Sequence, residues 1–198
     1  MSAAMSLKLE EHSPRPRCGC KGPGAEGWLR AQGYRVPADA NSAVLNADGV
    51  LVARLATSEF LLEPLGGGAE RVAATRAELT QRRQPATVYP IARQDFVVTI
   101  SGPGLDTLLR QVCSVDFAPL LAAARADDGP VVLTSMIGVG VIAWPRLNGG
   151  GADAAPAVTL WCEPSYAHYF WNTLLEVADG QGGLIINRAE TASAAGSN

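Results

Sequence analysis

A short pattern that occurs twice constrains the fold of this chain more than any other feature of its sequence. Residues 22–24 and 102–104 both read Gly-Pro-Gly, 80 positions apart, and each is followed in register by an acidic residue, an apolar pair and an arginine. A β-branched, apolar run over residues 96–100 precedes the second copy, as is typical of a strand. The apolar residues after it have the i, i+3, i+4, i+7 spacing of one buried helical face: Leu105, Leu108, Leu109 and Val112. The sequence therefore predicts a strand, a Gly-Pro-Gly turn and a short amphipathic helix.

A second pair of similar segments indicates an internal repeat. Residues 60–64, Phe-Leu-Leu-Glu-Pro, resemble residues 160–164, Leu-Trp-Cys-Glu-Pro, and each segment precedes a predicted helix. These segments lie 100 positions apart, so the second copy contains 20 additional residues. We interpret the chain as an α+β protein of two similar subdomains, with mixed or antiparallel strands and short helices, that arose by internal duplication. The alternative is coincidence, since Gly-Pro-Gly is common turn chemistry.

The expected organisation has four parts: a flexible N-terminal leader (1–16), a first α+β subdomain (17–84), a second α+β subdomain (85–188) and a disordered tail (189–198). In the first subdomain, Asp48-Gly49 between two apolar runs predicts a hairpin. In the second, residues 131–137 and 139–144 are almost wholly apolar and flank Gly138, which predicts a hairpin with both faces buried.

An aromatic cluster near the C-terminus predicts either an interface or a wide core helix. Five aromatic residues fall within eleven positions: Trp161, Tyr166, Tyr169, Phe170 and Trp171. A helix cannot direct all of them inward, and tyrosine and tryptophan are enriched at protein interfaces. We therefore expect Tyr166 or Tyr169 to serve an interface, with a broad buried helix face as the alternative.

Composition excludes several classes of function. The net charge is −3 and no long basic run occurs, so binding to nucleic acid through phosphate neutralisation is not expected. The sequence contains no 18-residue apolar stretch, and its N-terminus has no apolar core of signal-peptide length, so we expect a cytoplasmic protein that contacts no membrane. Only 18% of the residues are charged, which fits a surface covered by partners, although an alanine-rich composition also lowers this fraction.

The four cysteines are expected to be thiols, as in other cytoplasmic chains. Cys18 and Cys20 form the only close pair, near His12, and no second pair completes a four-ligand zinc site, so no metal site is predicted. A redox role for Cys18 and Cys20 is a weaker alternative. Cys113 and Cys162 have apolar neighbours and are expected in the core.

No residue set in the sequence predicts a catalyst. His168 should lie on the last helix on the side of Asn172, and no G-x-S-x-G element accompanies it, so a solvated or interface histidine is expected. Asp116 either accepts hydrogen bonds from a ligand or caps a turn. Arg30 and Arg110, which match between the copies, either bind acids or form surface salt bridges. The Gly-Pro-Gly turns lack the G-K-[ST] of a phosphate loop. We therefore predict no catalytic, cofactor-binding or metal-binding residue.

Several segments carry a family resemblance: residues 21–24 with Trp28-Leu29, 52–55, 59–62, 101–104, 113–117 and the helix from Tyr166 to Trp171. Through them the chain resembles the gamma subunit of heterotetrameric sarcosine oxidase over roughly residues 17 to 180, and the similarity rests on structural residues. That family is similar in turn to the folate-binding domain of the glycine-cleavage aminomethyltransferase, which has paired α+β subdomains.

The resemblance implies an accessory, non-catalytic subunit in a complex with alpha, beta and delta subunits. Such complexes oxidise an N-methyl amine such as sarcosine, pass the one-carbon unit to tetrahydrofolate and pass electrons through flavins to oxygen. FAD, FMN, NAD and tetrahydrofolate are therefore expected in the partner subunits and not in this chain. The identity of the amine substrate stays open, because related complexes act on N-methylglutamate or dimethylamine. The alternative is a stand-alone tetrahydrofolate-binding or aminomethyl transferase-like protein, with a carboxylate such as Asp116 in a cavity between the copies.

Overall fold

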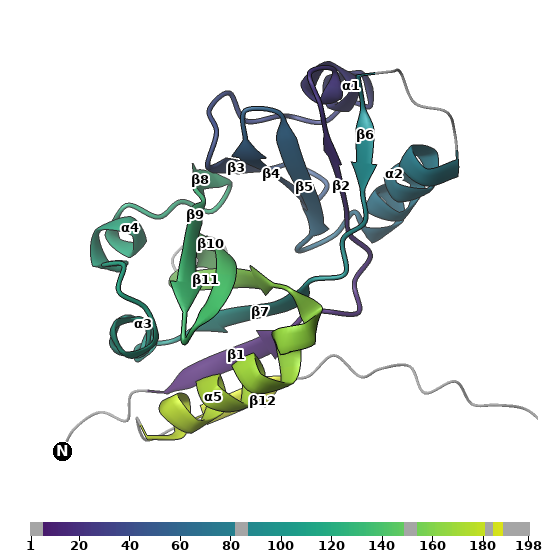
Figure 1. The fold of residues 1–198 in the computed structure, drawn as a ribbon. Helices are drawn as coiled ribbons and strands as arrows, with labels where there is room; N and C mark the ends of the chain where they lie inside the picture. The colour runs from purple at the N-terminus through teal and green to yellow at the C-terminus, as the bar shows by residue number, and fades with distance from the viewer. Residues whose placement is uncertain (1–5, 82–86, 149–153, 181–183, 188–198) are drawn as a thin grey trace, which may run out of the picture.

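The strands within the described residues form two six-stranded sheets. The computed structural model describes residues 6–81, 87–148, 154–180 and 184–187 (Figure 1). Sheet A contains, in spatial order, β12 (Leu184–Asn187), β1 (Leu7–Glu11), β7 (Phe96–Ser101), β11 (Ala155–Cys162), β10 (Val139–Asn148) and β9 (Val132–Met136). Sheet B contains β6 (Tyr89–Ile91), β2 (Cys18–Lys21), β5 (Glu59–Pro64), β4 (Val50–Ala56), β3 (Ser42–Leu45) and β8 (Asp128–Pro130).

Neighbouring strands in both sheets are antiparallel, except that β1 and β12 are parallel. The predicted hairpins at Asp48-Gly49 and at Gly138 are confirmed: they connect β3 to β4 and β9 to β10. The mixed α+β class is therefore confirmed, with two sheets and few helices. No helix within the described ranges is long and apolar enough to cross a membrane.

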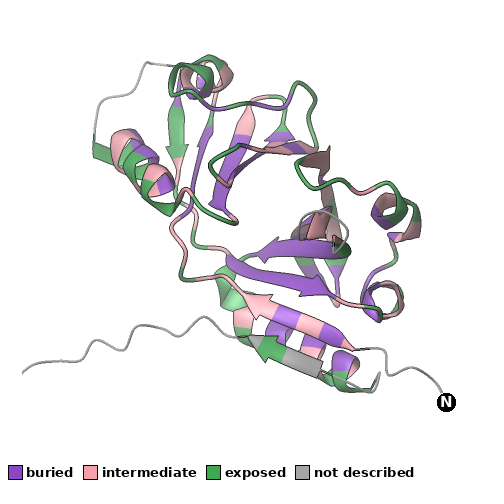
Figure 2. Cartoon of the chain, turned by 180° about the vertical axis from the view of Figure 1, so that it is seen from behind, coloured by how far each residue is buried: buried purple, intermediate pink, exposed green. Residues whose placement is uncertain are grey.

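Helices cover the outer face of each sheet, which gives an α/β/β/α order of layers. Sheet B packs against α1 (Ala25–Ala31) and α2 (Ala69–Gln81) in one apolar cluster. Sheet A packs against α3 (Leu105–Val112), α4 (Ala118–Ala122) and α5 (Ala167–Asp179) in a second cluster. A third cluster lies between the sheets and contains Trp144 and Trp161 of sheet A with Leu51 and Leu61 of sheet B. The central strands of both sheets are therefore largely buried, whereas the edge strands β6 and β9 and the outer faces of the helices have exposed residues (Figure 2).

The two sheets share one strand order. In sheet B the order β2-β5-β4-β3 matches β7-β11-β10-β9 in sheet A. In chain order, a short helix follows the first strand of each set, α1 after β2 and α3 after β7. A longer helix follows the strand that comes last in the chain, α2 after β5 and α5 after β11. The outer strands are exchanged: β1 precedes β2 but pairs with β7, whereas β6 precedes β7 but pairs with β2. This exchange joins the two halves through backbone hydrogen bonds.

The exchanged strands explain the Gly-Pro-Gly turns. Gly22 and Gly102 have φ values of 114° and 115°, a backbone conformation that residues with a side chain rarely adopt. A Cβ at Gly22 would lie 2.3 Å from the carbonyl oxygen of Thr87, just before β6. A Cβ at Gly102 would lie 2.3 Å from that of Ser6, just before β1. Each turn therefore needs glycine for its conformation and for the approach of the strand from the other half.

The expectation of a flexible leader over residues 1–16 is wrong for its described part. Residues 7–11 form β1, and Leu7 and Leu9 are fully buried under α5 in the outer core of sheet A. The alternation Leu-Lys-Leu-Glu is typical of a strand, but it spans few residues. Whether such a short segment forms a strand depends on the strand it pairs with, which here is β7. The expected tail, 189–198, and the boundary at 84 and 85 lie outside the described residues.

The expectation that both faces of the Gly138 hairpin are buried is also wrong. β9 is the edge strand of sheet A, and the side chain of Leu133 is 54% exposed. An edge strand lies at the margin of the sheet, where the packed layers above and below it can end. An apolar sequence therefore does not ensure that both faces of the strand are covered.

Candidate functional site

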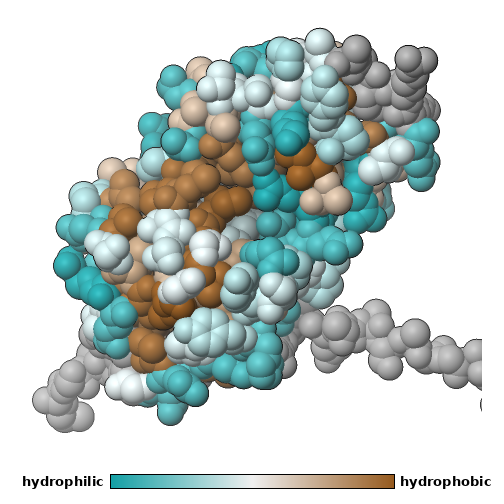
Figure 3. All heavy atoms as spheres, in the orientation of Figure 1, coloured by the Kyte–Doolittle hydropathy of each residue, from teal (hydrophilic) through white to brown (hydrophobic). Residues whose placement is uncertain are grey.

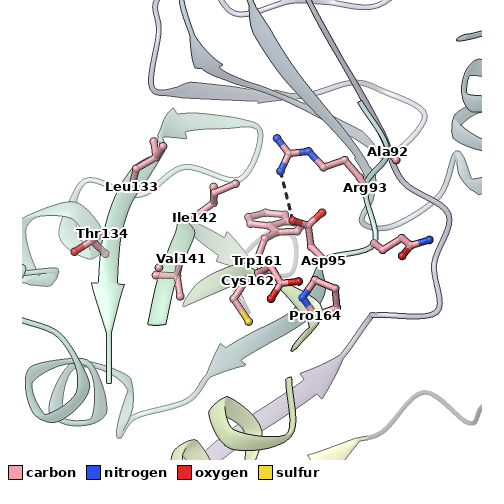
Figure 4. Close-up of a pocket in the computed structure, with 13 residues that line it drawn as sticks. Ala92, Arg93, Asp95, Leu133, Thr134, Val141, Ile142, Trp161, Cys162 and Pro164 are labelled. Carbon is pink, nitrogen blue, oxygen red and sulfur yellow. Dashed lines mark hydrogen bonds and ion pairs between the residues drawn. The ribbon is translucent and has the colours of Figure 1, made fainter. Parts of the chain in front are cut away.

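A groove lies where the linker from β6 to β7 passes the end of sheet A. Its volume is about 860 Å³, and it is the largest of the described hollows. Residues 92–95 of the linker form one wall, and side chains of β9, β10 and β11 form the other (Figure 4). The groove therefore lies between the linker that connects β6 to β7 and the β9 side of sheet A.

The floor of the groove is apolar and aromatic. Val141 and Ile142 come from β10, and Trp161 from β11, where cross-strand pairing sets Ile142 opposite Trp161. Trp161 is 1% exposed, and its Nε1 donates a hydrogen bond to Oε2 of Glu63 at 3.2 Å. Because a buried indole N–H requires an acceptor, this bond fixes the ring that forms the floor.

The linker wall carries an ion-pair chain. Arg93 donates from Nη2 to Oε1 of Glu59 at 2.9 Å and from Nη1 to Oδ1 of Asp95 at 3.4 Å. Oδ2 of Asp95 is buried and has no hydrogen-bond partner among the described residues. Nε of Arg93, which also lines the groove, is likewise buried without a hydrogen-bond partner among the described residues. Buried polar atoms without partners are uncommon, so these two side chains keep hydrogen-bonding capacity that a ligand could use.

A buried ion pair lies behind the floor. Nε of Arg17 donates to Oε2 of Glu63 at 2.8 Å, and the two side chains are 2% and 0% exposed. The other nitrogens of Arg17 donate to backbone oxygens, including those of His12 at 2.9 Å and Asp95 at 2.7 Å. Burial raises the pKa of Glu63, while the hydrogen bonds from Arg17 and Trp161 oppose that rise. This cluster joins both interstrand linkers to sheet B.

Sequence reasoning missed Arg17 and Asp95, and it used Glu63 only as part of a repeated segment. The signal for Glu63 was a charged residue inside an apolar strand, which is rarely buried without a partner. The partner, Arg17, lies 46 positions away, and no local pattern connects the two residues.

The groove lining contains one cysteine and charged side chains at its linker wall and at the end of β11. Its lining residues include no histidine. Burial, followed by the charges of Asp95 and Glu163, raises the pKa of the Cys162 thiol to about 11. The thiol is therefore protonated at neutral pH, and a protonated thiol is a poor nucleophile.

The charged residues singled out in the sequence lie outside this groove. Asp116 is exposed, and its Oδ1 accepts a hydrogen bond from the backbone N–H of Ala118 at 3.1 Å, so it closes a turn just before α4. Arg30 and Arg110 form surface salt bridges four residues back along their helices, to Glu26 at 3.0 Å and to Asp106 at 2.9 Å. In each case the structure favours the alternative without a ligand.

Cys18 and Cys20 lie buried in β2 as free thiols. Burial raises the pKa of each to about 12, which leaves both protonated and disfavours a redox role. His12 lies at the start of the linker after β1 and is half-buried, and desolvation lowers its pKa to about 4. Among the described residues, no group of three or more potential ligands could hold a metal ion.

The aromatic cluster divides as a helix requires. Trp161, Phe170 and Trp171 are buried, whereas Tyr166 and Tyr169 are 51% and 52% exposed. Their exposure fits the expected interface role, which stays a prediction. His168 lies on the same helix and is exposed, with its Nε2 3.0 Å from Nδ2 of Asn172, as expected from the sequence.

Comparison with known proteins shows a shared fold. The sequence matches no protein-family model and no curated protein. The structure is similar to a chain of the heterotetrameric sarcosine oxidase from Corynebacterium sp. U-96, solved in complex with pyrrole 2-carboxylate. The superposition has a TM-score of 0.67 and 20% sequence identity, and it covers 97% of this chain and 91% of the other. Nearly the whole of both chains therefore has the same fold.

Proposed function

We propose that this chain is an accessory, non-catalytic gamma-type subunit of a sarcosine oxidase-like complex that oxidises an N-methyl amine. The observation that carries the proposal is the near-complete coverage of both chains in the likeness to a heterotetrameric sarcosine oxidase chain. A subunit of similar length and fold fits that relation better than a shared module within a larger enzyme does. The partners in this proposal are the alpha, beta and delta subunits of the complex.

The exposed apolar surface supports a subunit role. Leu133, Tyr166 and Tyr169 are more than half exposed, and Tyr169 donates to the carbonyl oxygen of Ile137 at 3.0 Å, which links α5 to the Gly138 hairpin. Apolar residues gather on the face shown in Figure 3, where the edge of sheet A lies. Contiguous apolar surface of this kind is typical of protein–protein contact sites.

The same proposal assigns the cofactors to the partner subunits. FAD, FMN, NAD and tetrahydrofolate would be bound there, because the described residues of this chain supply neither a phosphate loop nor a reactive side chain in the groove. The proposal also includes an origin by internal duplication and a fold of the aminomethyltransferase folate-binding type, with subdomains at 17–84 and 85–188. The repeated strand order supports the duplication.

A stand-alone tetrahydrofolate-binding or aminomethyl transferase-like protein is the second candidate. One observation favours it: the groove contains an aromatic ring, that of Trp161, and the free acceptor of Asp95. Asp116, the carboxylate that the sequence suggested for this role, does not line the groove and closes a turn before α4. The carboxylate to change in a test of this candidate is therefore Asp95.

Two measurements separate the candidates. Native mass spectrometry of the tagged chain, purified gently from its source cells, should show a complex with larger subunits that carry flavin. Isothermal titration of the isolated chain with tetrahydrofolate should show no binding. A monomer that binds tetrahydrofolate, and loses it in the Asp95→Asn variant but not in Asp116→Asn, would support the second candidate and contradict the first.

A further inference from the structure

A small pocket beside the groove is lined by four arginines. Its volume is about 270 Å³, and it lies between the linker from β1 to β2, the linker from β6 to β7, and helix α2. The lining contains no carboxylate, and we call it the arginine pocket; it consists of Ser13, Pro14, Arg15, Pro16, Arg17, Arg76, Arg93 and Gln94. Such a lining presents hydrogen-bond donors almost without competing acceptors.

Three of the four guanidinium groups are held in place by the fold. Arg17 is fixed by Glu63 and by backbone oxygens, and Arg93 by Glu59 and Asp95. Arg15 donates from Nη1 to the carbonyl oxygens of Pro64 and Leu65 at 3.2 and 3.3 Å. Groups that are already ordered lose little conformational entropy when a ligand binds.

Two of the arginines, Arg15 and Arg76, form no salt bridge with a described carboxylate. The side chain of Arg15 donates hydrogen bonds to carbonyl oxygens, and its charge interacts with Glu63 only at longer range. Arg76 projects from α2 and is exposed, so it can reach a ligand without breaking an existing ion pair. The pocket therefore combines a rigid cationic wall with one free arginine at its mouth.

The neighbouring histidine reports the same positive environment. The pKa of His12 is lowered to about 4, chiefly by burial, and the charges of Arg15, Arg146 and Arg17 lower it further, against an opposite contribution from Glu10. A field that disfavours a second positive charge favours a negative one.

We propose that the arginine pocket binds the oxyanion group of a small molecule, a phosphate or a carboxylate, with Arg15 and Arg76 as the charged donors. Guanidinium groups match the geometry of both oxyanions and form charge-assisted hydrogen bonds with them. A volume of about 270 Å³ admits an oxyanion with a small organic part. This inference is independent of the proposed subunit role.

The test uses the full-length, ¹⁵N-labelled chain and follows its arginine Nε–H and backbone resonances during titration. The probes are inorganic phosphate and acetate, each compared with chloride at equal ionic strength. We expect saturable shifts at Ser13, Arg15, Arg17 and Arg76 with a Kd below about 10 mM for at least one probe. The probe with the lower Kd identifies the class of oxyanion.

A pair of matched variants tests the location of the site. Arg76→Gln should weaken binding by about tenfold or more, because it removes one charge-assisted contact. Arg35→Gln is the control, since Arg35 is also exposed and without a salt bridge to a described residue but does not line the pocket. No saturable binding of either probe beyond the chloride reference would overturn the proposal, as would an equal loss in both variants.

Discussion

Loss of the buried arginine should destabilise the fold more than any surface charge change. In Arg17→Met, Glu63 would keep its place in the core with the indole N–H of Trp161 as its remaining side-chain donor. Breaking a buried ion pair from one side costs about 3–5 kcal/mol. We therefore expect the free energy of unfolding at pH 7 to fall by that amount, measured by urea denaturation with the fluorescence of the buried Trp144 and Trp161.

The pH dependence of this loss follows from the protonation of Glu63. Burial raises the pKa of this carboxyl in the folded chain, and loss of Arg17 removes the main opposing interaction. A group whose pKa is higher in the folded state stabilises that state below its unfolded pKa, and the contribution disappears as pH rises through the folded value. The destabilisation caused by Arg17→Met should therefore be smaller at pH 5 than at pH 7.

A double-mutant cycle provides the decisive comparison. Glu63→Gln removes the opposing charge but keeps an acceptor for Trp161, and the two changes together should cost at least about 1 kcal/mol less than their sum. Arg30→Met, which breaks an exposed pair with Glu26, is the control and should change stability by no more than about 0.5 kcal/mol. A loss for Arg17→Met within the range of this control, or one that does not vary with pH, would refute the reasoning.

Three further predictions concern the turns, the linker and the surface. Gly102→Ala should lower the free energy of unfolding by about 1–3 kcal/mol, because the new Cβ would meet the backbone at Ser6; Gly138→Ala, with a φ of 81° but no atom within 4 Å, should cost less in the same denaturation assay. His12 has a folded pKa of about 4, below its ordinary 6.5, so its contribution to stability should fade as pH drops from 6.5 towards 4, and His12→Gln should flatten the thermal stability profile over that window; an unchanged profile would contradict this. Leu133→Asp should leave the stability of the isolated chain within about 0.5 kcal/mol, because Leu133 is half exposed, yet reduce recovery of the proposed partner subunits in a pull-down; equal recovery would remove β9 from the proposed interface.

Local features of the fold could be predicted from the sequence because neighbouring residues determine them. Gly102 and the apolar spacing after it were sufficient to predict the turn and α3, and Asp48-Gly49 to predict the hairpin of β3 and β4. The strand β1 was missed because its order depends on pairing with β7, about 90 positions later, and a five-residue alternation does not identify such a partner. The pair of Arg17 and Glu63 was missed for the same physical reason.

The exchanged strands also explain why both proposed sites lie where they do. Because β1 pairs with β7 while β6 pairs with β2, the linkers that follow β1 and β6 must both cross from one sheet to the other. Residues 12–17 and 92–95 are those linkers, and the hydrogen bond from Arg17 to the carbonyl oxygen of Asp95 joins them at the crossing. Such a crossing leaves chain that belongs to neither sheet, and its polar groups must be satisfied by side chains such as those of Arg17 and Arg93. The groove and the arginine pocket lie on two sides of this crossing, so a topology that interlocks the halves also supplies the charged residues from which a binding site can be built.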